Sequence, residues 1–285
     1  MSTTQKTATV GAALADARQR LAARSESPAL DAQLLLSHVS GLDKAQLLAH
    51  PERILGPKEL EAWQRALARL EDGLALPYLL GEWEFCALPL RVTPAVLIPR
   101  PETELLVETA LDWLRAHPGR RRAADVGTGS GAIAVVLVAD VPDVRVTAVD
   151  ISEEALAVAA SNAQRHGVQG RIELVHGDLL ADLNGPFDVI CANLPYIPTQ
   201  RLAHLAVARR EPLLALDGGP DGLDLIRRLL EQAPRRLAPG GLLLAEVDDS
   251  HEEQAAALAR SHFPLADIEV RPDLAGKVRL LTVGT

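Results

Sequence analysis

Apolar residues in the first 76 positions recur at helical spacing. Two segments show the pattern most clearly, with apolar residues at Val10, Leu14, Ala17 and Leu21 and again at Leu60, Trp63, Leu67 and Leu70. Residues three and four apart lie on one face of a helix. Between these segments, Ser27-Pro28 is typical of a helix start and Gly41 of a helix end. No strand-like alternation occurs before about Pro77, so residues 1–76 are predicted to form a small all-α bundle.

The helical spacing of apolar residues is lost between residues 77 and 101. Short extended pieces are interrupted by Gly81, Pro89, Pro94 and Pro99. Proline is poorly tolerated inside helices and central strands, so this segment is predicted to be a hairpin-like connector. Helical spacing returns over 102–115, which opens the remaining part of the chain, residues 102–285.

From residue 123 onward, short apolar runs alternate with helical segments. The runs lie at 123–126, 144–149, 172–175, 187–192 and 242–247, and the helical segments include 132–139, 152–166 and 223–237. Buried strands that alternate with helices predict an α/β domain with a doubly wound parallel sheet. The last two runs, 266–270 and 278–283, are joined by too few residues for a crossover helix. They predict an antiparallel edge.

Composition places the chain among globular proteins. At 285 residues and 48% hydrophobic content, it is long enough for two domains with a substantial core. The longest apolar run, 132–139, is too short to cross a bilayer, and the first residues lack the apolar core of a signal peptide. Cys86 and Cys191 have no metal-ligand spacing. We therefore expect free thiols, no metal, no membrane association and a cytoplasmic location.

The net charge of -9 bears on partners. A protein that binds nucleic acid through its phosphates needs a basic face, and the three short arginine runs of this chain are more typical of solvated helix ends. The charge balance favours a protein or small-molecule substrate over a nucleic acid.

A glycine loop follows the first predicted strand of the α/β region. It comprises Gly127, Thr128, Gly129, Ser130 and Gly131, and it opens a helix. Glycines there allow a tight turn and a close approach of backbone to ligand.

About 20 residues after this loop the second strand ends in Asp150, which can accept both hydroxyls of a ribose. The pair indicates a nucleoside-bearing cofactor, although the loop also fits a dinucleotide fingerprint. Asp125 favours S-adenosyl-L-methionine, because an acid there could face a cationic group and would repel a pyrophosphate.

The run Asn193-Leu-Pro-Tyr196 follows another predicted strand, so it should lie beside the glycine loop. The side-chain oxygen of Asn193 and the carbonyl of Leu194 can each accept one N–H of a planar NH₂ group. Holding both hydrogens frees the nitrogen lone pair to attack a methyl group. Pro195 makes the turn rigid, and Tyr196 offers a flat face to the planar group. This pattern predicts methyl transfer to a planar nitrogen through positioning rather than through a strong base.

These residues resemble the protein-(glutamine-N5) methyltransferases that modify class I peptide chain release factors. The most discriminating segment is Ile98-Pro-Arg-Pro-Glu-Thr-Glu104. The other matching segments are Tyr78-Leu-Leu-Gly81, the 125–131 loop, Ala148-Val-Asp-Ile-Ser152, Asn193-Leu-Pro-Tyr-Ile197, Glu211-Pro212, Asp217-Gly-Gly-Pro-Asp-Gly222, Pro239-Gly-Gly241 and Asp273-Leu-Ala-Gly276.

The resemblance implies a fold and partners. The expected fold is a Rossmann-like, seven-stranded S-adenosylmethionine-dependent methyltransferase domain, preceded by a small all-α helical bundle for substrate recognition and a β-hairpin connector. The expected partner is a class I peptide chain release factor as protein substrate. Direct nucleic-acid binding is not expected, and the chain is expected to act as a monomer.

The resemblance also implies roles for individual residues. Asn193, Leu194, Pro195 and Tyr196 would bind the glutamine amide, with Thr103 and Glu104 near the methyl-transfer centre. Arg100 and Glu102 either contribute to the site or hold the connector against the catalytic domain. The cofactor would be bound at its methionine end by Gly127, Thr128, Gly129, Ser130 and Gly131, at its ribose by Asp150 and at its adenine by Asp178 and Leu179. Asn193 would also contact the cofactor.

Two departures from the family pattern stand out. Leu194 occupies a position where proline is usual, and Asp248-Asp249-Ser250-His251 replaces a Gly…Gln pattern after Glu246. Asn-Leu-Pro-Tyr also occurs in ribosomal RNA adenine dimethyltransferases, so adenine-N6 methylation of RNA or DNA is the rival reaction. The rival family has its glycine loop near the chain start, whereas about 120 residues precede it here. A non-catalytic binding module fits poorly with an intact loop, ribose acid and Asn-Leu-Pro-Tyr.

Overall fold

The computed structural model describes residues 8–285, and it divides the chain into two compact units. The first unit ends at Gly81 and the second comprises Glu82–Thr285. The predicted boundaries at 76/77 and 101/102 stay predictions.

The first unit is helical, as predicted. Pro28 is the first residue of its second helix, and Gly41 ends that helix in the left-handed conformation. The short third helix was not predicted, although Asp43 and Gln46 form a capping box at its start. The apolar faces meet in one core that includes Leu35, Trp63 and Leu67. The helices are α1 Val10–Leu21, α2 Pro28–Ser40, α3 Lys44–Ala49, α4 Pro57–Glu71 and α5 Leu76–Leu80.

The second unit begins with the predicted hairpin. Strands β1 (Glu82–Phe85) and β2 (Leu88–Arg91) pair antiparallel around a turn at Cys86 and Ala87, which both have positive φ. The hairpin contacts α8 (Glu153–Arg165) through β2. There the Asn162 side chain accepts from the Arg91 N–H at 2.7 Å and donates to its carbonyl at 3.0 Å.

A seven-stranded sheet forms the centre of the second unit, in the order β5-β4-β3-β6-β7-β9-β8. The five strands from β5 to β7 are parallel, whereas β9 runs antiparallel to both of its neighbours. This confirms the predicted parallel sheet with an antiparallel edge. The strands are β3 Arg122–Val126, β4 Arg145–Asp150, β5 Ile172–His176, β6 Phe187–Ala192, β7 Leu237–Glu246, β8 Asp267–Pro272 and β9 Val278–Gly284.

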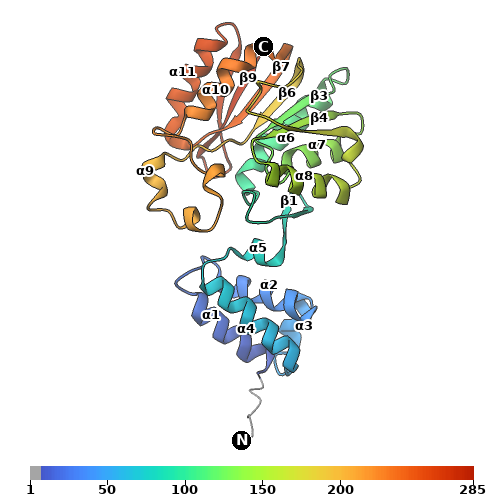
Figure 1. The fold of residues 1–285 in the computed structure, drawn as a ribbon, viewed down its shortest axis with the longest axis vertical. Helices are drawn as coiled ribbons and strands as arrows, with labels where there is room; N and C mark the ends of the chain where they lie inside the picture. The colour runs from blue at the N-terminus through green and yellow to red at the C-terminus, as the bar shows by residue number, and fades with distance from the viewer. Residues whose placement is uncertain (1–7) are drawn as a thin grey trace, which may run out of the picture. The chain divides into compact units, whose positions relative to one another are not determined.

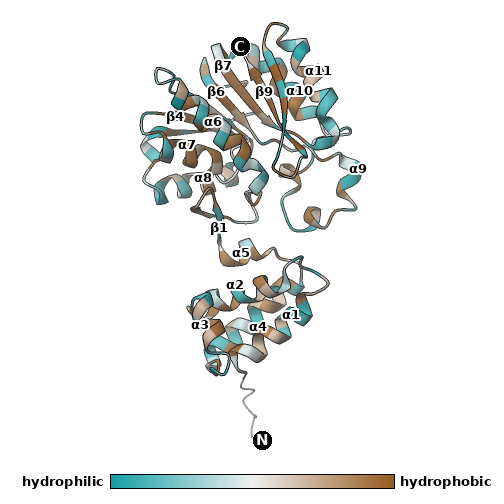
Figure 2. Cartoon of the chain, turned by 180° about the vertical axis from the view of Figure 1, so that it is seen from behind, coloured by the Kyte–Doolittle hydropathy of each residue, from teal (hydrophilic) through white to brown (hydrophobic). Residues whose placement is uncertain are grey.

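Helices cover both faces of this sheet (Figure 1). One face packs against α6, α7 and α8, and the other packs against α10 and α11. Helix α7 is buried on all sides because it is almost wholly apolar. Figure 2 shows the hydrophobic strands between helices that have hydrophilic outer sides. The remaining helices are α6 Glu104–Ala116, α7 Ala132–Asp140, α9 Thr199–Leu202, α10 Asp224–Gln232 and α11 Glu252–His262.

The parallel strands end at the same edge of the sheet, and this edge positions the site. The ends of β3, β4 and β6 lead directly into the glycine loop, Asp150 and Asn193. No helix described from residue 8 onward is both long and apolar enough to cross a membrane.

Candidate active site

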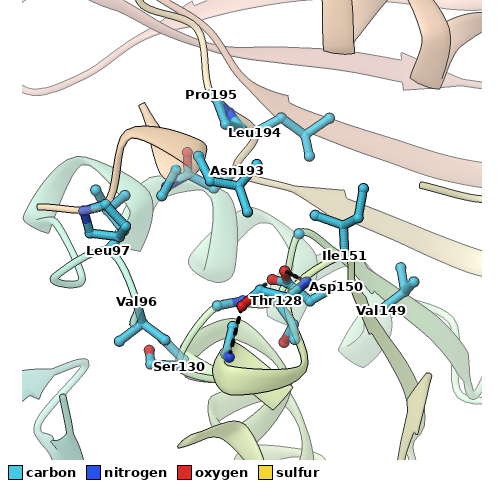
Figure 3. A pocket seen from close by; sticks show the side chains of 18 of the residues that line it. Val96, Leu97, Thr128, Ser130, Val149, Asp150, Ile151, Asn193, Leu194 and Pro195 are labelled. Atoms are coloured by element: carbon cyan, nitrogen blue, oxygen red, sulfur yellow. Dashed lines mark hydrogen bonds between the residues drawn. The ribbon is translucent and has the colours of Figure 1, made fainter. Parts of the chain in front are cut away.

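A cavity of about 340 Å³ opens at the carboxyl ends of the parallel strands (Figure 3). Such a volume is typical of small-molecule sites, which are mostly apolar with a few placed polar groups. Most of the residues predicted to bind the cofactor and the amide line it. They are Gly127, Thr128, Gly129, Ser130, Asp150, Asp178, Leu179, Asn193, Leu194 and Pro195, together with Thr103.

The glycine loop turns tightly out of β3. Gly127, Gly129 and Gly131 have φ values of 74°, 54° and 78°, a conformation that favours glycine. The N–H groups of Gly127 and Thr128 both donate to the carbonyl of Val149, at 2.9 and 3.0 Å. These bonds hold the loop against the end of β4. Gly131 is the exception among the predicted loop residues, because it lies at the start of α7 and does not line the cavity.

Asp125, near the end of β3, holds this loop through hydrogen bonds. Its side chain is fully buried, and its Oδ2 accepts from the Thr128 hydroxyl at 2.6 Å and from the Ala134 N–H at 3.1 Å. Burial raises the pKa of this carboxyl to about 6, although the two hydrogen bonds lower it. Asp125 does not line the cavity, so the expectation that it faces a cationic group of the cofactor is not supported. It joins the loop to helix α7 instead.

Asp150 faces the cavity from the end of β4. Its Oδ2 accepts from the Gly129 N–H at 2.8 Å, and its Oδ1 accepts from the Ser152 N–H at 2.9 Å. A carboxylate oxygen has two lone pairs, so each oxygen keeps one for a further donor. This arrangement can accept two neighbouring hydroxyl groups.

Asp178 and Leu179 form another part of the wall, after β5. Asp178 is about half exposed and makes an ion pair with Arg228 of α10, which also lines the cavity. Leu179 is buried with a φ of 54°. Arg228 was not predicted from the sequence, because it lies 50 positions after Asp178 in the chain.

The Asn193 loop lies across from the glycine loop. Leu194 is only 3% exposed, and its Cδ2 atom is 2.8 Å from where a Cβ on Gly127 would stand. The family departure at Leu194 therefore places an apolar side chain between the two loops.

A chain of side-chain hydrogen bonds lies behind Asn193. The Asn193 Nδ2 donates to the Thr103 Oγ1 at 2.8 Å, and Thr103 donates to the Glu246 Oε2 at 2.7 Å. The Tyr196 hydroxyl donates to the other oxygen, Glu246 Oε1, at 3.0 Å. Glu246 is 1% exposed, and burial raises the pKa of its carboxyl. Burial together with the nearby Glu246 also raises the pKa of Tyr196.

Glu246 was not predicted as a site residue, although a carboxylate at the end of a buried strand beside the Asn193 strand is a usable signal. Its strand, β7, pairs with β6 up to Ala192 and Ala245, so the following residues are neighbours.

Two predicted residues lie elsewhere. Glu104 does not line the cavity, and its Oε1 accepts from the Cys86 N–H at the hairpin turn, at 3.0 Å. Tyr196 does not line the cavity either, and its hydroxyl donates to Glu246. Its flat face against the planar group stays a prediction.

Two segments without regular strands close the cavity on the outer side. Residues 94–97 and 99 form one part, and residues 212, 214 and 215 form the other. Arg100 makes an ion pair with Glu211, which is 5% exposed and also accepts from the Ile98 N–H at 3.1 Å. This geometry favours a structural role for Arg100. Within residues 8–285, no group of three His, Cys, Asp or Glu side chains could hold a metal ion.

Family models match most of the first unit and about half of the second. Residues 12–81 match the PrmC N-terminal domain, and residues 101–210 match the methyltransferase small domain.

Curated relatives extend the match over most of the chain. The release factor glutamine methyltransferase of Moorella thermoacetica is 46% identical, over 95% of this chain and 96% of its own. The protein of the same name from Bordetella pertussis is 45% identical, over 89% and 93%.

Solved structures share the fold. A methyltransferase from Pyrococcus furiosus has a TM-score of 0.52 at 20% identity, covering 78% of this chain and 98% of its own. The 16S rRNA N2 G1207 methyltransferase of T. thermophilus, solved with AdoMet and guanosine, has a TM-score of 0.52 at 18% identity, covering 72% and 49%. At these identities the likeness concerns the fold alone.

Proposed function

The chain belongs to the release factor glutamine methyltransferase family, and on this premise we propose its reaction. It transfers a methyl group from S-adenosyl-L-methionine to the side-chain amide nitrogen, N5, of the glutamine in the Gly-Gly-Gln motif of class I peptide chain release factors. The observation that supports this most is the oriented amide of Asn193, which lines the same cavity as the glycine loop. This supports a site in which the Asn193 oxygen accepts an N–H group beside the proposed nucleoside site.

The residues present fit S-adenosylmethionine. The cavity is of small-molecule size, and Asp150 has a free lone pair on each oxygen for the two ribose hydroxyls. We assign the methionine end to residues 127–130, which Gly131 supports from the start of α7, and the adenine to Asp178 and Leu179. When bound, the cofactor supplies an electrophilic methyl group on a sulfonium, which leaves as a neutral thioether.

The chain activates its substrate by holding it. An amide nitrogen is a weak nucleophile because its lone pair is delocalised. In our proposal the Asn193 Oδ1 and the Leu194 carbonyl each accept one N–H of the glutamine amide. The nitrogen is then favoured in a pyramidal form whose lone pair forms the new N–C bond. One N–H proton leaves to solvent after the methyl group has arrived, so no strong base is needed before the attack.

The helical first unit is proposed to recognise the release factor. We further propose that the chain acts as a monomer in the cytoplasm and does not bind nucleic acid directly. Sedimentation of the pure protein tests the monomeric state, and binding to labelled RNA tests the absence of nucleic-acid binding.

Adenine-N6 methylation is not favoured, since the relatives that match nearly the whole chain are named for glutamine methylation. A labelled methyl donor with either unmodified release factor or ribosomal RNA separates the two reactions. Label in the release factor alone is the expected outcome. Label in the RNA alone would contradict the proposed function and support adenine-N6 methylation.

A further inference from the structure

The buried carboxylate of Glu246 receives two hydroxyl groups, one on each oxygen. Thr103 and Tyr196 lie 2.7 and 3.0 Å from it. Each of these two hydroxyls donates to one oxygen of the carboxyl group, Thr103 to Oε2 and Tyr196 to Oε1. Glu246 therefore fixes the direction of the proton on each neighbour.

The direction at Thr103 decides the direction at Asn193. A threonine hydroxyl has one proton, and here that proton points to Glu246. Toward Asn193, the Thr103 oxygen can only accept, so the amide must present its NH₂ group across the 2.8 Å contact. The amide oxygen of Asn193 is then left for the cavity, where Figure 3 shows the Asn193 side chain.

The opposite orientation of the Asn193 amide is disfavoured. It would place an oxygen against an oxygen that has no proton to offer, and Thr103 is 4% exposed, which leaves water little access to repair the mismatch. It would also present an NH₂ group to the cavity, which suits a carboxylate and not an amide N–H.

We propose that Glu246 is a positioning residue that, through Thr103, orients the Asn193 amide so that the site accepts a glutamine and discriminates against a glutamate. This rests on the proposed function, since it assigns the polarity of the same amide site. Glu246 itself does not line the cavity, so its effect on the site passes through Thr103.

Thr103→Val and Glu246→Gln test the proposal. Valine keeps the shape of threonine but removes the hydroxyl, so Asn193 is free to turn. A glutamine at position 246 has only one oxygen for the hydroxyls of Thr103 and Tyr196. Thr103 therefore has a hydrogen-bond acceptor only part of the time. The matched control is Thr282→Val, the same change at a 7% exposed threonine of β9 whose hydroxyl makes only a 3.4 Å bond to a backbone carbonyl.

The readout is the preference for glutamine over glutamate. Methyl transfer is measured on unmodified release factor, with release factor carrying glutamate at the target position as competitive inhibitor. Thr103→Val should lower kcat about 10- to 100-fold, because a group that positions the substrate is lost. It should also strengthen inhibition by the glutamate form relative to KM for the glutamine form. Glu246→Gln should lie between the wild type and Thr103→Val, and cofactor affinity by calorimetry should stay near that of the wild type.

Two results would overturn the positioning role. One is equal kcat and equal glutamine preference in Thr103→Val and Thr282→Val. The other is a combined variant whose fold-loss in kcat equals the product of the two single fold-losses. Residues that act through one another do not contribute independently, so the proposal predicts a smaller combined loss. If the wild type transfers no methyl group to the glutamine, the proposed function fails and this inference fails with it. An active wild type with unchanged variants removes the positioning role alone.

Discussion

Gly127 and Leu194 fit together only because residue 127 has no side chain. A Cβ on Gly127 would stand 2.8 Å from the Leu194 Cδ2, and Leu194 is 3% exposed. This contact joins the glycine loop at the end of β3 to the Asn193 loop at the end of β6. The proposed cofactor site and the proposed substrate site therefore share one packing contact.

Gly127→Ala is expected to destabilise the protein by about 1–3 kcal/mol beyond the cost of its positive φ, because it overpacks a buried contact. Gly129→Ala is the matched comparison, since Gly129 also has a positive φ but nothing lies within 4 Å of its Cβ position. Urea unfolding of both variants measures the difference. Equal losses would show that the contact with Leu194 is not tight.

The same contact predicts coupling between the two residues. Leu194→Ala alone should cost about 2–5 kcal/mol by leaving a cavity. In the combined Gly127→Ala, Leu194→Ala variant the new methyl group has room, so the combined loss should be smaller than the sum of the single losses. Additive losses would contradict the packing account.

Asp150→Ala should weaken cofactor affinity about 10- to 100-fold, because hydrogen bonds from a charged group are lost. Isothermal titration calorimetry with S-adenosylmethionine measures this directly. Asp143→Ala, before β4 at the opposite edge of the sheet, removes an exposed carboxylate and serves as control. Unchanged affinity in Asp150→Ala would refute the ribose assignment.

The buried carboxyl of Asp125 predicts a pH dependence of stability. Its pKa is raised from 3.8 to about 6 in the folded protein. Between these values the unfolded state has lost the proton while the folded state still holds it, so the free energy of unfolding falls as pH rises. The two pKa units correspond to about 3 kcal/mol, which is present below pH 4 and lost through pH 6.

Asp125→Asn removes this titration. Urea unfolding of both proteins from pH 4 to 7.5 should show the wild type losing stability relative to the variant over that window. A constant difference across the window would mean that the carboxyl is not shifted.

Much of the site could be predicted because its residues follow strands. The glycine loop, Asp150 and Asn193 each come directly after an apolar run, and parallel strands end at one edge of a sheet. Local spacing alone therefore brought together residues that lie up to 66 positions apart in the chain, from 127 to 193.

The rest depended on packing that no local pattern encodes. The bond between Thr103 and Glu246 joins residues 143 positions apart. Glu104, next to Thr103 in the sequence, points instead to the hairpin turn at Cys86, because successive residues of a helix face different directions. The wall formed by residues 212–215 lies in a stretch of short 3₁₀ turns with no periodic pattern.

Asn193→Ala should lower kcat about 100- to 1,000-fold, as expected when a placed polar group that acts in the transition state is removed. Cofactor affinity should change far less. Asn184→Ala, the same substitution in an exposed loop, is the control. Single-turnover methyl transfer with each variant separates the chemical step from binding, and normal turnover in Asn193→Ala would remove the amide-clamp role.

The most direct test of the central claim is mass-spectrometric mapping of release factor after incubation with the protein and S-adenosylmethionine. The account predicts one added methyl group on the glutamine of the Gly-Gly-Gln motif, and none when that glutamine is replaced. A methyl group on any other residue, or no methyl group on the release factor, would contradict it.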